Sequence, residues 1–177
     1  KDVKCTKAGV PKKTVNNSKE DRFVDPIREK DDVARIASYL LDRAKAAKTE
    51  SKMKAGYRNW LIFVVGVNVG VRVSDLTCLK WDHIFEADMK TFREAAVKIE
   101  KKTGKTKLIC INRDMAYAFK RYLEMTKIEP KSGMYIFESG YNRGDDEVHT
   151  ISTAAVEKVI KKATKECGLK GNYNTHS

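Results

Sequence analysis

The most apolar run of the chain, WLIFVVGVNVGV from Trp60 to Val71, limits the possible folds more than any other feature. It is a dozen residues long, whereas a membrane-spanning helix needs about 20. Apolar residues on all sides of a helix are typical of a central helix that other elements cover. The run therefore predicts a core helix from about Tyr57 to Asn68, and no membrane partner is expected.

The length and the charge of the chain narrow the classes of protein further. A chain of 177 residues suits one domain. It carries 36 Lys and Arg against 24 Asp and Glu, a net charge of +12. Such an excess favours polyanions, either nucleic acid or an anionic membrane surface. Residues 1–21 are polar and basic without apolar periodicity, which predicts a flexible linker or arm before a domain over 22–177.

The cysteines argue against a metal site and against a disulfide framework. The four cysteines, at positions 5, 78, 110 and 167, form no CxxC pair and no set with histidines at zinc-ligand spacing. Cys78, Cys110 and Cys167 lie in apolar contexts and are predicted to be reduced, buried thiols of an intracellular protein. No secretory signal is recognisable, so a cytoplasmic protein is expected.

The first half of the domain is predicted to be mainly helical. Apolar residues at helical spacing indicate a helix that starts near Asp31 or Asp32, with early acids that suit the helix dipole. Gly70 is expected to end the core helix, and Ser74 to cap a short helix that reaches Leu79.

In the second half of the domain, the spacing of apolar residues changes from that of helices to that of strands. WDHIF, AAVKIE and TKLICIN predict three short strands, and Gly104 offers the positive φ of a tight hairpin between the last two. Asn112 is expected to cap a helix, MYIFES to be a short extended piece, and Ser152 to open a final helix that stops at Gly168. The predicted class is α+β: mostly helical, with a small three-stranded antiparallel sheet.

Positive charge is concentrated on the hairpin and on the helix after it. Ten Lys and Arg stand between Lys98 and Lys131, against four acids. A solvated surface would explain most of them, but clustered cations on a protruding hairpin also suit the phosphates of a nucleic acid. Lys102 lies at the tip among other cations, which lower the pKa of an ammonium and suit it to act as a general acid.

An arginine follows the core helix in GVRVSDLTCLKW, residues 70–81. A guanidinium at the end of a buried helix needs an anion nearby. Asp75 is the intramolecular candidate, and a bound phosphate, held by the planar fork of Arg72, is the other. The two interactions are compatible if Asp75 orients Arg72 from the side opposite the phosphate.

The three histidines give weaker signals. His83 is predicted to lie in a strand and to be structural, and His149 to be a cap or a surface residue before the last helix. His176, in NYNTHS, is unremarkable when taken alone.

Taken in order, these segments resemble the catalytic domain of the tyrosine recombinases, the phage integrase family, over about Pro26 to Ser177. GVRVSDLTCLKW looks like the first motif of the family, KIEKKTGKTKLICI like its basic hairpin, and NYNTHS like the start of its histidine box. The resemblance implies that Arg72, Lys102 and His176 are catalytic and that Asp75 supports Arg72. Lys101, Lys105, Lys107 and Arg113 are the expected DNA contacts.

The resemblance also implies a mechanism and partners. In the family a tyrosine attacks a DNA phosphodiester and forms a 3′-phosphotyrosyl bond without a metal or a nucleotide cofactor. The partner is double-stranded DNA at a recombination site, and the intact protein is expected to work as a tetramer, this chain alone as a monomer. The implied setting is a phage or another mobile element, with recombination at the bacterial nucleoid.

The second arginine and the nucleophilic tyrosine of the family pattern would follow Ser177. The resemblance therefore implies a catalytic domain whose C-terminal part is missing, which binds DNA but does not cleave it alone. Two alternatives stay open: a non-catalytic nucleic-acid-binding module, and a basic scaffold whose hairpin meets an acidic partner.

Overall fold

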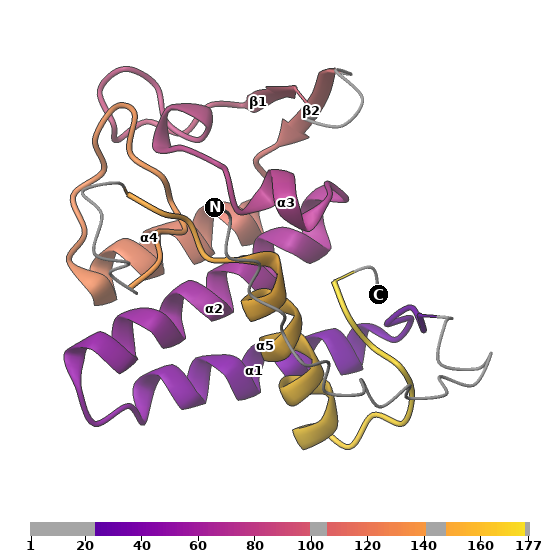
Figure 1. Ribbon diagram of the computed structural model, residues 1–177. Coiled ribbons are helices and arrows are strands. Elements are labelled where there is room, and N and C mark those ends of the chain that lie inside the picture. Colours follow the sequence, from indigo (N-terminus) through magenta and orange to yellow (C-terminus); the bar gives the residue numbers. More distant parts are fainter. Residues whose placement is uncertain (1–23, 100–105, 141–147, 176–177) are drawn as a thin grey trace, which may run out of the picture.

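The structure of the chain is a computed structural model, which describes residues 24–99, 106–140 and 148–175. Helix α2 (Glu50–Val69) runs through its middle, with α1 (Lys30–Lys45) packed on one side and α4 (Arg113–Thr126) on the other (Figure 1). Tyr57, Leu61 and Val65 of α2 are fully buried. The predicted core helix is thus confirmed. None of the helices in the described ranges combines the length and the apolarity that a bilayer crossing requires.

Helix α2 begins at Glu50 rather than near Tyr57, so the sequence-based start was wrong. Thr49 caps the helix by accepting the N–H of Lys52 at 3.3 Å, and Lys54 pairs with Glu50 at 2.7 Å. Because this first part of α2 is largely polar, the apolar pattern does not mark it. At the other end Gly70, with φ of 53°, ends the helix as predicted.

Helices α1 and α2 pack at a close crossing that depends on a glycine. A Cβ atom added to Gly56 would lie 2.8 Å from the Cα atom of Ala44, closer than real Cβ contacts. Helix α1 begins at Lys30 and carries Asp31 and Asp32 in its first turn, which confirms the predicted start.

The connection after α2 differs from the prediction in two places. Helix α3 (Val73–Leu76) is capped by Arg72 and not by Ser74, because the Arg72 carbonyl accepts the N–H groups of Asp75 and Leu76, each at 2.9 Å. Residues Trp81–His83 form the 3₁₀ helix η2 instead of a strand.

The two remaining predicted strands are present. Strands β1 (Ala95–Ile99) and β2 (Thr106–Cys110) form an antiparallel pair with Ala95 opposite Cys110. The sheet of the described residues therefore has two strands, and the expected third strand was wrong. Cys110 is exposed rather than buried, because residues of β2 alternate between faces and its neighbour Ile109 is the buried one. Cys78 and Cys167 are half-buried, and Cys78, Cys110 and Cys167 form no disulfide with one another.

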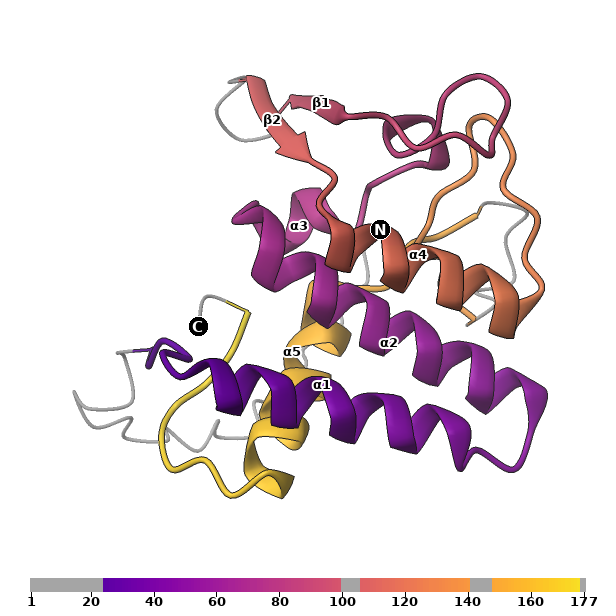
Figure 2. The ribbon, with the colours of Figure 1, turned by 180° about the vertical axis from the view of Figure 1, so that it is seen from behind.

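The caps of the last two helices match the sequence. Asn112 accepts the N–H of Met115 at 2.9 Å at the start of α4, and Ser152 accepts that of Ala155 at 3.2 Å at the start of α5 (Thr153–Glu166). Helix α5 contacts α1, α2 and α3 and crosses their layer steeply, in front of it in Figure 1 and behind it in Figure 2.

Aromatic side chains join η2 to α4. The fully buried Trp81 stacks on Phe85 with ring centroids 5.8 Å apart and meets Phe119 edge-on at 6.1 Å. The extended piece that follows α4 pairs with the chain next to Trp81, where Tyr135 forms an isolated bridge with Lys80. This cluster fixes the segment that links α3 to the hairpin.

Candidate functional site

Arg72 is exposed and lies in the short connection between α2 and α3. Its backbone is constrained on both sides: Gly70 adopts the left-handed conformation, and the Arg72 carbonyl accepts two hydrogen bonds from the first turn of α3. A guanidinium on a rigid, exposed part of the backbone can bind an anionic group with several oxygens, such as a phosphate, from solvent.

Asp75 lies one helical turn behind Arg72 and is 1% exposed. Buried carboxylates are costly unless other groups compensate their charge or donate hydrogen bonds to them. Asp75 is buried and Arg72 is exposed, and the N–H of Asp75 donates to the carbonyl of Arg72 at 2.9 Å. The supporting role of Asp75 stays a prediction.

The base of the hairpin is tied to the end of α2. Asn112, which follows β2, donates its side-chain amide to the Oδ1 atom of Asn68 at 2.6 Å. Asn68 in turn donates to the carbonyl of Val64 at 2.8 Å within α2. Arg113, an expected DNA contact, is exposed and directly follows Asn112. The hairpin base and the Arg72 connection are therefore held together by side-chain amides.

The C-terminal segment reaches the same region. Asn174 and Thr175 line a small cavity of about 80 Å³ together with Val71 and Val73, the two neighbours of Arg72. The residue after Thr175 is His176, so the chain approaches the Arg72 connection just before the predicted histidine.

Two hydrogen bonds hold the C-terminal segment in place. Asp25 donates its N–H to the carbonyl of Asn172 at 3.0 Å and accepts the N–H of Asn172 through Oδ2 at 2.7 Å. Gly171 has φ of 153°, and a Cβ atom there would lie 2.7 Å from Oδ2 of Asp25. The segment before α1 thus clamps the residues that lead to His176.

Several predicted site residues lie outside the described residues: Lys101, Lys102, Lys105 and His176. Lys107 belongs to β2, and its side chain is not described either. Their roles remain predictions. The structure brings together the elements that carry them, namely the Arg72 connection, the hairpin base and the C-terminal segment.

The other two histidines have structural positions. His83 accepts the N–H of Lys80 through Nδ1 at 2.9 Å within η2, which confirms a structural role but not the predicted strand. The carbonyl of His149 accepts the N–H of Ser139 at 2.6 Å. Among the described residues, no cluster of His, Cys, Asp and Glu is arranged to hold a metal ion.

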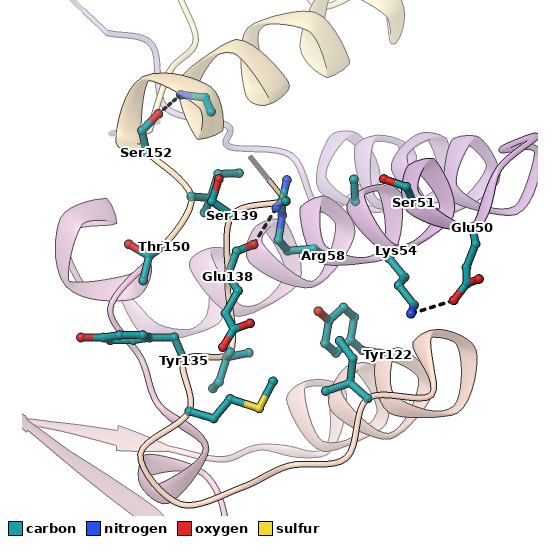
Figure 3. A pocket seen from close by; sticks show the side chains of 17 residues that line it. Glu50, Ser51, Lys54, Arg58, Tyr122, Tyr135, Glu138, Ser139, Thr150 and Ser152 are labelled. Atoms are coloured by element: carbon teal, nitrogen blue, oxygen red, sulfur yellow. Dashed lines mark hydrogen bonds and ion pairs between the residues drawn. The ribbon is translucent and has the colours of Figure 1, made fainter. Parts of the chain in front are cut away.

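A larger cavity, of about 1030 Å³, lies between the first half of α2, the end of α4 and the chain around residues 134–140 and 150–155 (Figure 3). Arg58 donates to the carbonyl of Glu138 at 2.7 Å, and burial lowers the pKa of its guanidinium. Burial also raises the pKa of Glu138, and that of Tyr122 to about 12.

This larger cavity suits a phosphodiester less well than the region of Arg72. Its walls include the carboxylates of Glu50 and Glu138, and its lysine, Lys54, is already paired with Glu50 (Figure 3). Carboxylates repel an anion, which makes this cavity a poor site for a phosphate.

Comparison with known proteins decides the family. The sequence profile of the phage integrase family matches residues 32–177. The chain belongs to the phage integrase family. Its members are the tyrosine recombinases, which agrees with the motifs around Arg72.

Two individual proteins are similar to this tyrosine recombinase domain. The probable integrase/recombinase YoeC of Bacillus subtilis (strain 168) is 24% identical over 155 residues, which cover 88% of this chain and 70% of YoeC. The solved structure of the XerH site-specific recombinase bound to difH, a pre-cleavage complex, matches with a TM-score of 0.56 and 15% identity. That match covers 86% of this chain and 40% of the XerH chain, and at this identity it shows the fold alone.

Sequence reasoning missed the groups that assemble the site. Asn68 and the pair Asp25 and Asn172 carry no motif, and their partners are distant in the chain. The one available signal was the cap at Asn112, which indicated a rigid start of α4 but not the second hydrogen bond of its amide.

Proposed function

We propose that this chain is the DNA-binding part of a site-specific recombinase in which Arg72 holds the phosphodiester that is cut. The observation that carries the proposal is the exposed Arg72 on a rigid connection, with Asp75 buried behind it. The hairpin base and the C-terminal segment converge on the same connection. Membership of the family supplies the reaction class.

In this reaction a tyrosine hydroxyl attacks the phosphorus atom, and the bond to the 5′-oxygen breaks. The phosphorane has extra negative charge on its non-bridging oxygens, so a fixed guanidinium stabilises it more than the ground state. Arg72 would supply one such cation. Lys102 would protonate the departing 5′-oxygen, and His176 would donate a hydrogen bond to the phosphate or move a proton near the nucleophile.

DNA binding by the chain would rest on backbone phosphates. Lys101, Lys105 and Lys107 belong to the hairpin in sequence, Arg113 follows it, and all four would contact phosphates along the groove of the duplex. All seven tyrosines of the sequence precede His176, whereas the family order places the nucleophile after it. The 177-residue chain would therefore bind duplex DNA without forming a covalent adduct.

A nicked suicide duplex tests this proposal with the chain itself. We expect salt-dependent binding and no covalent protein–DNA adduct on a denaturing gel. An adduct would show that the nucleophile lies within the 177 residues. If the full-length protein binds DNA but does not cut it, the alternative of a non-catalytic binding module is favoured.

A further inference from the structure

A second concentration of positive charge lies at the other end of α2, in a groove of about 550 Å³. Its walls are the last turns of α1, the connection to α2, the first half of α2 and one side of α5. No carboxylate lines it. We call it the basic groove, after its four cations: Arg43, Lys48, Lys52 and Lys162.

The charges of the basic groove are not neutralised by neighbours. The two nearest acids in sequence are already paired with other lysines, Asp42 with Lys45 at 3.2 Å and Glu50 with Lys54 at 2.7 Å. Within the part of the chain that the structure describes, the four groove cations form no ion pair. The guanidinium carbon of Arg43 lies over the ring of Tyr39, 5.9 Å from its centroid, and both residues line the groove.

The surface of the groove suits a phosphate backbone better than a protein partner. Four of its lining residues are small, Ala46, Ala47, Ala55 and Gly56, and its larger apolar ones are Tyr39, Leu40 and Val159. Protein interfaces depend on large aromatic or apolar anchors in pockets. Of the large apolar residues that line this groove, Leu40 is buried and Tyr39 and Val159 are half-buried, and none of the exposed ones among the described residues lines it. Contacts to phosphates need cations and close approach, which small side chains permit.

We propose that the basic groove binds a run of DNA backbone phosphates, in addition to the phosphate at Arg72. The inference rests on the proposed function for its ligand, because a recombinase brings DNA to the domain. It goes beyond that function because it assigns a second DNA contact, at the basic groove, whose residues belong to none of the family motifs.

The basic groove is separate from the Arg72 region. Gly56 lines the groove and Val69 ends α2 beside Arg72, which places the two regions about 20 Å apart along the helix. They also use different sides of α5: Val159 and Lys162 line the groove, whereas Val156 and Ile160 line the small cavity beside Arg72. In Figures 1 and 2 the connection between α1 and α2 lies at the far end of the molecule from α3 and the hairpin.

Two pieces of DNA could supply these phosphates, and the charges of the groove suit both equally. They belong either to a flanking part of the duplex held at Arg72 or to a second duplex. Both present the same run of phosphate charges.

The test compares a groove variant with a matched control of equal charge. The groove variant is Arg43→Gln with Lys48→Gln, Lys52→Gln and Lys162→Gln. The control is Arg28→Gln with Lys30→Gln, Lys90→Gln and Lys170→Gln, which removes one arginine and three lysines from exposed positions that form no ion pair with a described residue. Circular dichroism and urea unfolding establish that both remain folded.

The first assay measures the affinity for a 30-base-pair duplex of random sequence between 50 and 200 mM salt. Four phosphate contacts contribute on the order of a hundredfold to the loss of affinity over this range. If one duplex fills both regions, the groove variant should lose most of this salt dependence and the control should keep it. The second assay measures bridging, as energy transfer between two differently labelled duplexes. If the groove holds a second duplex, only the groove variant should lose bridging.

Three results would overturn the inference. The groove variant could behave like the control in both assays. Poly-glutamate could bind the wild-type chain but not the groove variant while DNA binding is equal, which would assign the groove to an acidic polypeptide. Absence of salt-dependent DNA binding in the wild type would remove this inference together with the proposed function. If only the inference about the groove fails, the wild-type chain still binds DNA and Arg72→Ala still weakens this binding.

Discussion

Asn112 donates its side-chain amide to Asn68 at 2.6 Å, and this contact joins the base of the hairpin to α2, the helix that ends three residues before Arg72. The same side chain caps α4 by accepting the N–H of Met115. The hairpin carries the predicted Lys102, so the contact couples the expected general acid to the expected phosphate-binding arginine. Catalysis requires such groups to keep a fixed relative geometry.

Asn68→Ala should loosen the hairpin without unfolding the domain. A neutral hydrogen bond contributes about 0.5 to 1.5 kcal/mol, so we expect amide exchange in β1 and β2 to become up to about tenfold faster. Hydrogen exchange followed by mass spectrometry would measure this change. Asn112→Ser keeps a capping side chain but is too short for the contact, and combining it with Asn68→Ala should add little. Additive effects would show that the two residues act independently.

Gly56→Ala should destabilise the domain, because the new methyl group would lie 2.8 Å from Cα of Ala44. Overpacking of this kind costs about 1 to 3 kcal/mol, which the better helix propensity of alanine offsets by about 1 kcal/mol. Gly66→Ala in the same helix is the control, since its methyl group would meet only Leu76 at an ordinary 3.5 Å. Urea unfolding should give a lower free energy for Gly56→Ala and an equal or higher one for Gly66→Ala. The reverse order would contradict the close crossing of α1 and α2.

Tyr122 should make the domain sensitive to alkaline pH. Burial raises the pKa of its hydroxyl from 10.0 to about 12. A raised pKa means that the folded state holds the proton more tightly, so this contribution is complete below pH 10 and is lost as the pH rises toward 12. The loss amounts to about 2 to 3 kcal/mol.

Tyr122→Phe isolates the effect of this hydroxyl. The free energy of unfolding of the variant, measured from pH 8 to 12, should fall less steeply than that of the wild type. Equal slopes would mean that other groups, such as lysines, account for the alkaline loss of stability.

Lys102→Ala in a complete recombinase should suppress strand cleavage with only a modest loss of DNA affinity. The predicted reason is that a general acid contributes about 10²- to 10⁴-fold to the rate, whereas one phosphate contact has a small share in binding. A duplex with a 5′-phosphorothiolate leaving group needs no protonation and should restore cleavage by the variant. Equal loss of binding and cleavage, without this rescue, would make Lys102 a phosphate contact only.

Local signals in the sequence predicted those parts of the fold that local hydrogen bonds determine. Asn112 and Ser152 cap their helices, and Gly70 ends α2, because each of these effects depends on neighbours within a few residues. The segment from Trp81 to Phe85 was misjudged. Its aromatic and branched residues suggested a strand, but Ile84 and Phe85 both donate to the carbonyl of Trp81, and the apolar side chains pack at helical spacing.

The candidate site, too, was predicted only where the signal is local in the sequence. The motif around Arg72 was recognisable, and the family that it indicated is confirmed, whereas the roles of Arg72 and Asp75 stay predictions. The contacts that assemble the site join residues far apart in sequence, such as Asp25 with Asn172. The basic groove has the same origin, because Lys52 and Lys162 come together only when α5 crosses α2. No sequence pattern reports such contacts.

The central claim is that the guanidinium of Arg72 binds the phosphodiester during cleavage. Single-turnover cleavage of a nicked duplex by the complete recombinase, with and without Arg72→Lys, tests it most directly. Since lysine keeps the charge but not the two-pronged geometry, we expect the cleavage rate to fall by about 10²- to 10³-fold while DNA affinity changes little. An unchanged cleavage rate in the variant would contradict the account.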